Sequence, residues 1–158
     1  RHATTQEEQA LSDAASERHI FVYGTLRKAL RHEMVGVLVR EAHFVGEASV
    51  RGVLFDLGTY PGLVVNKQAT GLVKGEIYEL RAPSAVGTLA ALDEYEGCAP
   101  SDVEPHEYRR VLVQVTLADG RMLSAWAYVL NRALAGLTPI PSGDYVAWLG
   151  RCTNSDDV

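Results

Sequence analysis

The 158-residue sequence predicts one α+β domain of about five strands and three helical segments. Five stretches are rich in β-branched and aromatic residues and end near turn residues, which is typical of strands. Three other stretches have apolar residues at helical spacing or residues that start and stop helices. Residues 1–18 are small and polar, which favours a flexible N-terminal arm or a short surface helix. We expect the folded domain at residues 19–152 and a C-terminal tail at 153–158.

The first strand is predicted at residues 19–23, because HIFVY is rich in β-branched and aromatic side chains and stops at Gly24. A short helix is predicted next, since apolar side chains recur every four residues from Leu26 to Leu38. Gly36 weakens this helix, because glycine has a low helix propensity.

Four further strands and a second helix are predicted in the middle of the chain. The strands are expected at residues 44–55, 70–80, 108–117 and 122–130. Asp119 and Gly120 mark a hairpin turn between the last two strands. The second helix is expected from Pro83 to about Glu96, because proline suits the first turn of a helix and Gly97 suits its end.

A terminal helix is predicted after Ser142, whose hydroxyl can accept a hydrogen bond from a free N–H group at the start of the helix. The apolar residues behind it recur at helical spacing and are expected to pack on the domain. They are Tyr145, Val146, Trp148, Leu149 and Cys152.

Composition and charge exclude several classes of partner. The 15 basic and 20 acidic residues leave a formal net charge of -5 without a basic patch, so we expect no nucleic-acid partner. No apolar run approaches the roughly 20 residues that a membrane-spanning helix needs, so we expect no membrane partner. The 2 cysteines have neither CxxC spacing nor the density of a disulfide framework, which favours a reducing compartment and a cytoplasmic location.

Short motifs occur in a fixed order along most of the chain. They are YGTL at 23–26, YPG at 60–62, KGEIY at 74–78, LDEYEG at 92–97, YRR at 108–110, AWAY at 125–128 and IPSGDY at 140–145. YGTL alone fits an ordinary strand-to-helix turn, but the ordered series resembles the gamma-glutamylcyclotransferase-like family. The resemblance implies a small mixed β-barrel-like sheet flanked by helices. It also implies cyclisation of a small gamma-glutamyl compound to 5-oxoproline with release of an amine, with no cofactor and no metal.

The chain departs from the family pattern beside the YGTL motif. Many relatives continue with a basic residue, a glycine and an asparagine, whereas this chain has Ala29 and His32 in that vicinity. The departure affects the expected shape of the cavity entrance and therefore the gamma-glutamyl compound that fits. The leaving group is left undetermined.

Glu96 matches the family's catalytic position, second to last in LDEYEG. In the family reaction the substrate's own amino group is the nucleophile, so a single carboxyl group can remove and return the proton. An acid in the last turn of a helix faces the negative end of the helix dipole, and apolar surroundings also disfavour its charge. Both effects predict a raised pKa. The alternative is an exposed helix-end carboxylate, and Asp93 and Glu94 are expected to be structural or solvent-facing.

The turn at YGTL is expected to bind the substrate. The resemblance assigns this role to Tyr23, Gly24, Thr25 and Leu26, whose successive backbone N–H groups could meet a carboxylate or the developing oxyanion. Glycine would permit the close approach that such a contact needs.

Two tyrosines in the later motifs have two open interpretations. Tyr108 and Tyr128 match family positions that border the pocket, but tyrosine is also often a core residue with a paired hydroxyl. Arg109 and Arg110 beside Tyr108 are expected to form surface ion pairs.

Histidine and cysteine spacing favours no other chemistry. The histidines show no HExxH or comparable ligand pattern, so no metal site is expected. A nucleophilic pair of Cys98 and His106 lacks a recognisable orienting residue.

Two other functions remain open at this point. The chain could be a non-catalytic member of the fold that binds a small ligand, because fold alone does not imply turnover. It could also be an enzyme that acts on a different amide or amine in a biosynthetic pathway. The sequence leaves the oligomeric state undetermined.

Overall fold

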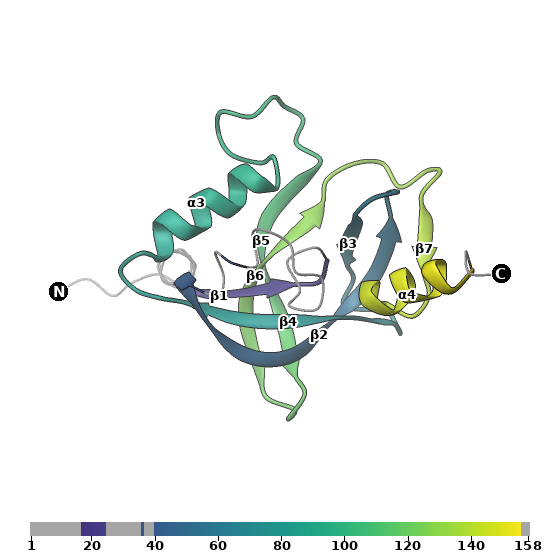
Figure 1. The fold of residues 1–158 in the computed structure, drawn as a ribbon, viewed down its shortest axis with the longest axis horizontal. Helices are drawn as coiled ribbons and strands as arrows, with labels where there is room; N and C mark the ends of the chain where they lie inside the picture. The colour runs from purple at the N-terminus through teal and green to yellow at the C-terminus, as the bar shows by residue number, and fades with distance from the viewer. Residues whose placement is uncertain (1–16, 25–35, 37–39, 156–158) are drawn as a thin grey trace.

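The structure is a computed structural model that describes residues 17–24, 36 and 40–155. Its strands are β1 (His19–Val22), β2 (Ala42–Asp56), β3 (Pro61–Val65), β4 (Leu72–Leu80), β5 (Tyr108–Leu117), β6 (Met122–Leu130) and β7 (Thr138–Ile140). Its helices are α3 (Ala85–Tyr95) and α4 (Tyr145–Ser155). Figure 1 shows the long strand β2 bending from the α3 end of the molecule to the α4 end.

Five strands close into a ring in the order β1, β4, β2, β5 and β6. Four of the contacts are antiparallel, and the ring closes where β1 and β6 pair in parallel at Ile20 and Trp126. β3 lies between β2 and β6, and β7 pairs with β2 outside the ring. The predicted α+β class and small mixed barrel of about five strands with flanking helices are therefore confirmed.

The hairpin formed by β5 and β6 has the predicted bounds. Asp119 and Gly120 form its turn, where Gly120 has a φ of 92° and Asp119 accepts a 3.0 Å hydrogen bond from the Arg121 N–H. The left-handed φ explains the glycine, because other residues adopt it at a cost. The predicted strands at 44–55 and 70–80 correspond to β2 and β4, with three of the four ends shifted by one or two residues.

Two strands, β3 and β7, were not predicted from the sequence. β3 begins with Pro61 and Gly62, and β7 has three residues with a proline at its centre. Proline lacks an N–H group and is rare inside sheets, so these stretches resemble loops in the sequence. Both strands pair with β2, which supplies the missing neighbours.

The start of α3 differs from the prediction. The helix begins at Ala85 with Ser84 as its N-cap residue, so Pro83 lies in the preceding turn rather than in the first helical turn. The Ser84 carbonyl accepts from both the N–H and the hydroxyl of Thr88, at 2.9 and 3.1 Å. These two bonds stabilise the first turn of the helix, and Pro83 is not part of that turn.

The cap of α4 is Asp144 and not Ser142, which corrects the prediction. Asp144 Oδ1 accepts hydrogen bonds from the N–H groups of Val146 and Ala147, at 3.1 and 3.3 Å. The Ser142 hydroxyl instead accepts from the Asp144 N–H at 3.3 Å, in the turn before the helix. Both residues are good N-cap types, and the position of the first helical turn decides between them.

Three predicted segments lie wholly or partly outside the described residues. The helix expected from Leu26 to Leu38 is described only at Gly36, and the arm expected at residues 1–18 is described only at 17 and 18. α4 extends to Ser155, into the segment expected to be a C-terminal tail. Neither described helix combines the length and the apolarity needed to cross a membrane.

The buried residues form two clusters that hold α3 on the barrel. The first fills the barrel and includes Leu54, Leu63 and Val115. The second lies between α3 and β1, β4, β5 and β6, and it includes Ile20 and Leu92. Leu92 is fully buried, and burial of a leucine side chain contributes about 2 kcal/mol. This packing places the end of α3 against the barrel.

Candidate active site

Helix α3 ends in a Schellman motif that sets the position of Glu96. The Gly97 N–H donates to the Glu94 carbonyl at 3.1 Å, and the Cys98 N–H donates to the Asp93 carbonyl at 2.9 Å. Gly97 adopts a φ of 73°, the left-handed conformation that this motif requires and that glycine adopts most easily. Gly97 is thus the predicted end of the helix, and Glu96 is its C-cap residue.

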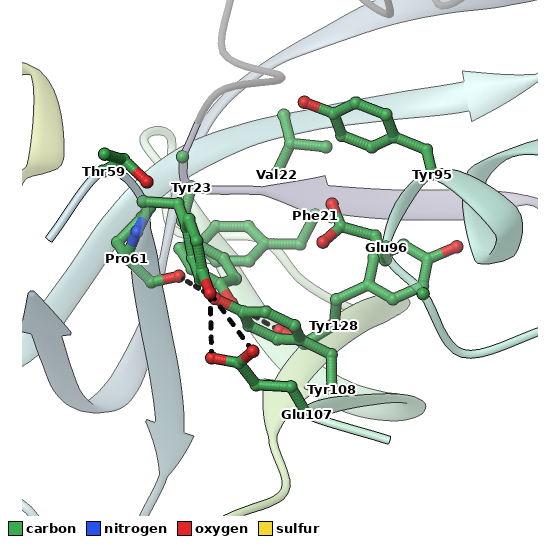
Figure 2. A pocket seen from close by; sticks show the side chains of 13 residues that line it. Phe21, Val22, Tyr23, Thr59, Pro61, Tyr95, Glu96, Glu107, Tyr108 and Tyr128 are labelled. Atoms are coloured by element: carbon green, nitrogen blue, oxygen red, sulfur yellow. Dashed lines mark hydrogen bonds between the residues drawn. The ribbon is translucent and has the colours of Figure 1, made fainter. Parts of the chain in front are cut away.

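Glu96 lines a cavity of about 580 Å³ between the end of α3 and the barrel. The other walls come from β1 and the turn after it, the start of β3, the residue before β5, and tyrosines of β5 and β6. Figure 2 shows the Glu96 carboxylate pointing into the space bounded by Tyr23, Tyr108 and Tyr128. A cavity of this volume can hold a small molecule.

Burial raises the pKa of the Glu96 carboxyl from 4.5 to about 7. The side chain is half-buried, whereas Glu94 on the same helix is exposed. Loss of water around the carboxylate disfavours its charged form, and the negative end of the helix dipole acts in the same direction. Glu96 is therefore not the exposed helix-end carboxylate that was the alternative.

The turn after β1 forms the wall on the other side of the cavity. Tyr23 and Gly24 are buried and line it. A Cβ atom on Gly24 would lie 2.8 Å from Pro61 Cγ, so glycine is needed here for close packing. Thr25 and Leu26, the other predicted binding residues of this turn, lie outside the described residues.

The Tyr23 hydroxyl connects three parts of the cavity wall. It donates a hydrogen bond to the Tyr128 carbonyl at 2.5 Å and accepts one from the Leu63 N–H at 3.2 Å. Burial raises the pKa of Tyr23, and the charge of Glu96 raises it further. The phenol is therefore neutral and holds β1, β3 and β6 in a fixed arrangement.

Tyr108 and Tyr128 are both core residues and cavity residues, so the two interpretations are compatible. Their side chains are buried, and both line the cavity. The Tyr108 hydroxyl donates to the Pro61 carbonyl at 2.5 Å, and the Tyr128 hydroxyl donates to Asp93 Oδ1 at 2.7 Å. Burial is the main cause that raises the pKa of each phenol.

Asp93 is structural and joins α3 to the barrel. Its carboxylate forms an ion pair with Arg110 of β5, with 2.8 Å between Arg110 Nε and Asp93 Oδ1. Arg110 also lies over the ring of Trp126, with its guanidinium carbon 4.3 Å from the ring centroid. Arg110 thus forms an expected ion pair, but a half-buried one beside the cavity rather than one on the surface.

Two polar cavity residues were not predicted from the sequence. Tyr60 and Glu107 both line the cavity, and the Tyr60 hydroxyl lies 3.1 Å from each carboxylate oxygen of Glu107. Tyr60 belongs to the YPG motif, which could have indicated a role. Glu107 has no such signal beyond its position next to Tyr108.

The described residues favour neither a nucleophilic pair of Cys98 and His106 nor a metal site. Burial, followed by the negative charges of Asp93 and Glu96, raises the pKa of the Cys98 thiol to about 11. The thiol is protonated near neutral pH, which disfavours a nucleophilic pair with His106. Among the described residues, no three His, Cys, Asp or Glu side chains are grouped so that they could hold a metal ion.

The barrel, the helix that ends at an acid and the cavity between them define a gamma-glutamylcyclotransferase-like fold. The solution structure of YtfP from Escherichia coli matches with a TM-score of 0.56 at 36% identity, over 84% of this chain and 97% of that one. The crystal structure of a mouse AIG2-like protein matches with a TM-score of 0.55 at 28% identity, over 71% of this chain and 76% of that one.

The chain belongs to the gamma-glutamyl cyclotransferase, AIG2-like family, whose sequence model matches residues 20–147. The gamma-glutamylcyclotransferase family protein ytfP of Citrobacter rodentium is 37% identical over 135 residues, which cover 84% of this chain and 96% of that protein. The resemblance noted in the motifs is therefore confirmed at the level of the family.

Proposed function

We propose that this chain is a gamma-glutamylcyclotransferase that converts a gamma-glutamyl amine, amino acid or peptide to 5-oxoproline and a free amine. The observation that supports this most is Glu96, a half-buried acid with a pKa of about 7 that lines a cavity of about 580 Å³. A general acid/base works best when its pKa lies near the working pH.

One carboxyl group can serve both proton transfers of this reaction. The Glu96 carboxylate takes a proton from the substrate's α-ammonium group, and the free amine attacks the γ-carbonyl carbon. The new C–N bond closes the five-membered ring, and the protonated Glu96 gives its proton to the leaving nitrogen as the original amide bond breaks. The ring nitrogen then loses its second proton to Glu96, which passes it to the released amine. The products are a neutral lactam and an ammonium ion, so atoms and charge balance and Glu96 is again a carboxylate.

The turn after β1 is the proposed site for the substrate's negative groups. Backbone N–H groups from Tyr23 to Leu26 would bind the α-carboxylate or the oxygen that gains charge during attack. One fact supports this role for the part of the turn that is described: Tyr23 and Gly24 line the cavity.

The buried tyrosines are proposed to hold the cavity in one shape. Tyr23, Tyr108 and Tyr128 each donate their hydroxyl proton to a protein oxygen, so each ring is fixed at both ends. A rigid wall favours the folded conformation in which the substrate's amino group reaches its own γ-carbonyl, and such positioning can account for a large part of a rate enhancement.

The test is release of 5-oxoproline by the purified chain from a panel of gamma-glutamyl amines, amino acids and peptides. Glu96→Gln should lower kcat by at least about 100-fold, the lower range for loss of a general acid/base. Glu94→Gln is the matched control, because it removes the same charge from an exposed position of the same helix and should keep full activity.

Two results would contradict the proposal. Binding of these compounds without release of 5-oxoproline would indicate a non-catalytic binding protein. Cyclisation at the wild-type rate by Glu96→Gln would remove this residue from the mechanism and leave the acid/base unassigned.

A further inference from the structure

Glu107 is a cavity residue to which the proposed reaction assigns no role. It directly precedes β5, and it lines the same cavity as Glu96. The Tyr60 hydroxyl holds its carboxylate, at 3.1 Å from both oxygens. Figure 2 shows the Glu107 carboxylate across the cavity from Glu96, with the Tyr108 ring between the two acids. One acid thus lies at each side of the space that a substrate would fill.

The charges along the described part of the cavity wall have one sign. Glu96 and Glu107 line it, and none of its described lining residues is a lysine, an arginine or a histidine. Arg132 Nη1 lies 3.6 Å from Glu107 Oε1, but Arg132 is half-exposed and does not line the cavity. The Glu107 carboxylate therefore faces the cavity. The Arg132 guanidinium, which does not line the cavity, weakens the negative potential of that carboxylate.

Aromatic rings accompany the Glu107 carboxylate. The ring centroids of Tyr60 and Tyr108 are 6.2 Å apart, with 55° between the ring planes. After burial and Tyr23, the charges of Glu96 and Glu107 are the next causes that raise the pKa of Tyr108, which agrees with its place between the two acids. A carboxylate beside tyrosine rings suits an alkylammonium group, which gains both a charged hydrogen bond and a cation–π contact.

We propose that Glu107 determines specificity by selecting gamma-glutamyl compounds whose leaving amine has a second, positively charged ammonium group. This inference rests on the proposed function, in which Glu96 and the turn after β1 bind the reacting glutamyl part. The leaving amine then extends toward Glu107 and Tyr60. A diamine-type leaving group places its free ammonium beside the carboxylate, whereas a leaving amino acid places its own carboxylate there and is repelled.

The test compares three substrates that differ only in the charge at the far end of the leaving amine. They are the gamma-glutamyl derivatives of diaminobutane, butylamine and aminobutanoate, which are cationic, neutral and anionic. The wild-type chain should show the highest kcat/KM for the cationic compound. Glu107→Gln should lower that value about fivefold and raise the anionic one, while the neutral compound changes less than about twofold, as expected for a partly exposed charge.

Two further variants separate a charge effect from a structural effect. Arg132→Gln removes the opposing charge, so it should shift the preference in the other direction, toward the cationic compound. Glu104→Gln removes an exposed acid three residues before Glu107 that does not line the cavity, and it should leave all three values unchanged. Equal losses on all three substrates in Glu107→Gln, or a shift of the same sign in Arg132→Gln, would overturn the inference.

Failure of the proposed reaction can be distinguished from failure of this inference. If the wild-type chain releases no 5-oxoproline from any of the three compounds, the reaction is wrong, and calorimetric binding of the same compounds tests Glu107. Tighter binding of the cationic compound that Glu107→Gln loses would uphold the selection of charge. Equal binding of all three compounds would overturn it.

Discussion

The guanidinium group of Arg110 in β5 donates to both carboxylate oxygens of Asp93 in α3, at 2.8 and 3.3 Å. The Tyr128 hydroxyl of β6 donates to the same carboxylate at 2.7 Å. Asp93 lies three residues before Glu96, so these bonds fix the last turn of the helix on two strands of the barrel. The ion pair is thereby a positioning element for the proposed acid.

Arg110→Gln should reduce activity mainly through kcat. Loss of the ion pair lets the end of α3 shift, and a displaced acid/base costs about tenfold in kcat, with KM changed less than about threefold. The free energy of unfolding should fall by about 1–2 kcal/mol, since the pair is only half-buried. Arg109→Gln, on the exposed neighbouring residue, is the control. Equal effects of the two variants on kcat would argue against positioning.

The pH dependence of kcat/KM should report the raised pKa of Glu96. The carboxylate is the form that accepts the proton, so activity is low when Glu96 is protonated and rises with pH through about 7. Steady-state rates measured from about pH 5 to 8 check this. A profile already level above pH 5 would show that the acting group has an ordinary carboxyl pKa.

Glu96→Gln should be more stable than the wild type at pH 8 and equally stable at pH 4. The folded chain binds the Glu96 proton more tightly than the unfolded chain, with a pKa of about 7 against an ordinary 4.5. The contribution of Glu96 to stability is therefore complete below pH 4.5 and is lost as the pH rises through 7. The difference reaches at most about 3.5 kcal/mol, at about 1.4 kcal/mol per pKa unit. Urea unfolding at both pH values measures it, and no gain at pH 8 would contradict the raised pKa.

Gly24→Ala should destabilise the chain and impair the cavity. The added Cβ would meet the Pro61 ring at 2.8 Å, and such overpacking costs about 1–3 kcal/mol. The Pro61 carbonyl also accepts the hydrogen bond from the Tyr108 hydroxyl. A shift of Pro61 would therefore also move Tyr108, which lines another wall of the cavity. Gly87→Ala is the opposite case, since this exposed glycine of α3 has open space for a Cβ and should gain about 0.5–1 kcal/mol. Thermal unfolding of the two variants should thus move in opposite directions.

Asp144→Ala should cost about 1 kcal/mol of unfolding free energy, because it removes the N-cap of α4. Ser142→Ala removes one hydroxyl from the preceding turn and should cost less. Urea unfolding of both variants ranks the two residues. A larger loss of unfolding free energy in Ser142→Ala than in Asp144→Ala would show that Ser142, the residue expected from the sequence, is the N-cap.

Local patterns predicted the elements whose signals are local. The strands at Tyr108–Leu117 and Met122–Leu130 are uninterrupted β-rich runs joined by an Asp-Gly turn, and the structure has both at those bounds. β3 and β7 could not be predicted in this way, because their partner β2 makes them strands despite their prolines. The local sequence of β3 or β7 does not show that the segment will pair with β2.

The same distinction applies to the cavity. The place of Glu96 at the end of a helix could be predicted because the glycine that ends the helix is next to it in the sequence. Tyr60 and Glu107 are 47 residues apart, as are Pro61 and Tyr108, and only the closed barrel brings each pair together. The alternatives for Tyr108 and Tyr128 stayed open for a similar reason, since the sequence does not show that one side chain can be buried and still border a cavity.

The two acids of the cavity depend on separate parts of the chain. Glu96 depends on the register of α3, where one inserted residue before Gly97 would turn it by about 100° around the helix axis. Glu107 depends instead on the loop between Cys98 and β5, which follows the helix in the chain. A change in that loop would therefore alter the proposed contact to the leaving amine while the proposed acid keeps its place at the end of α3.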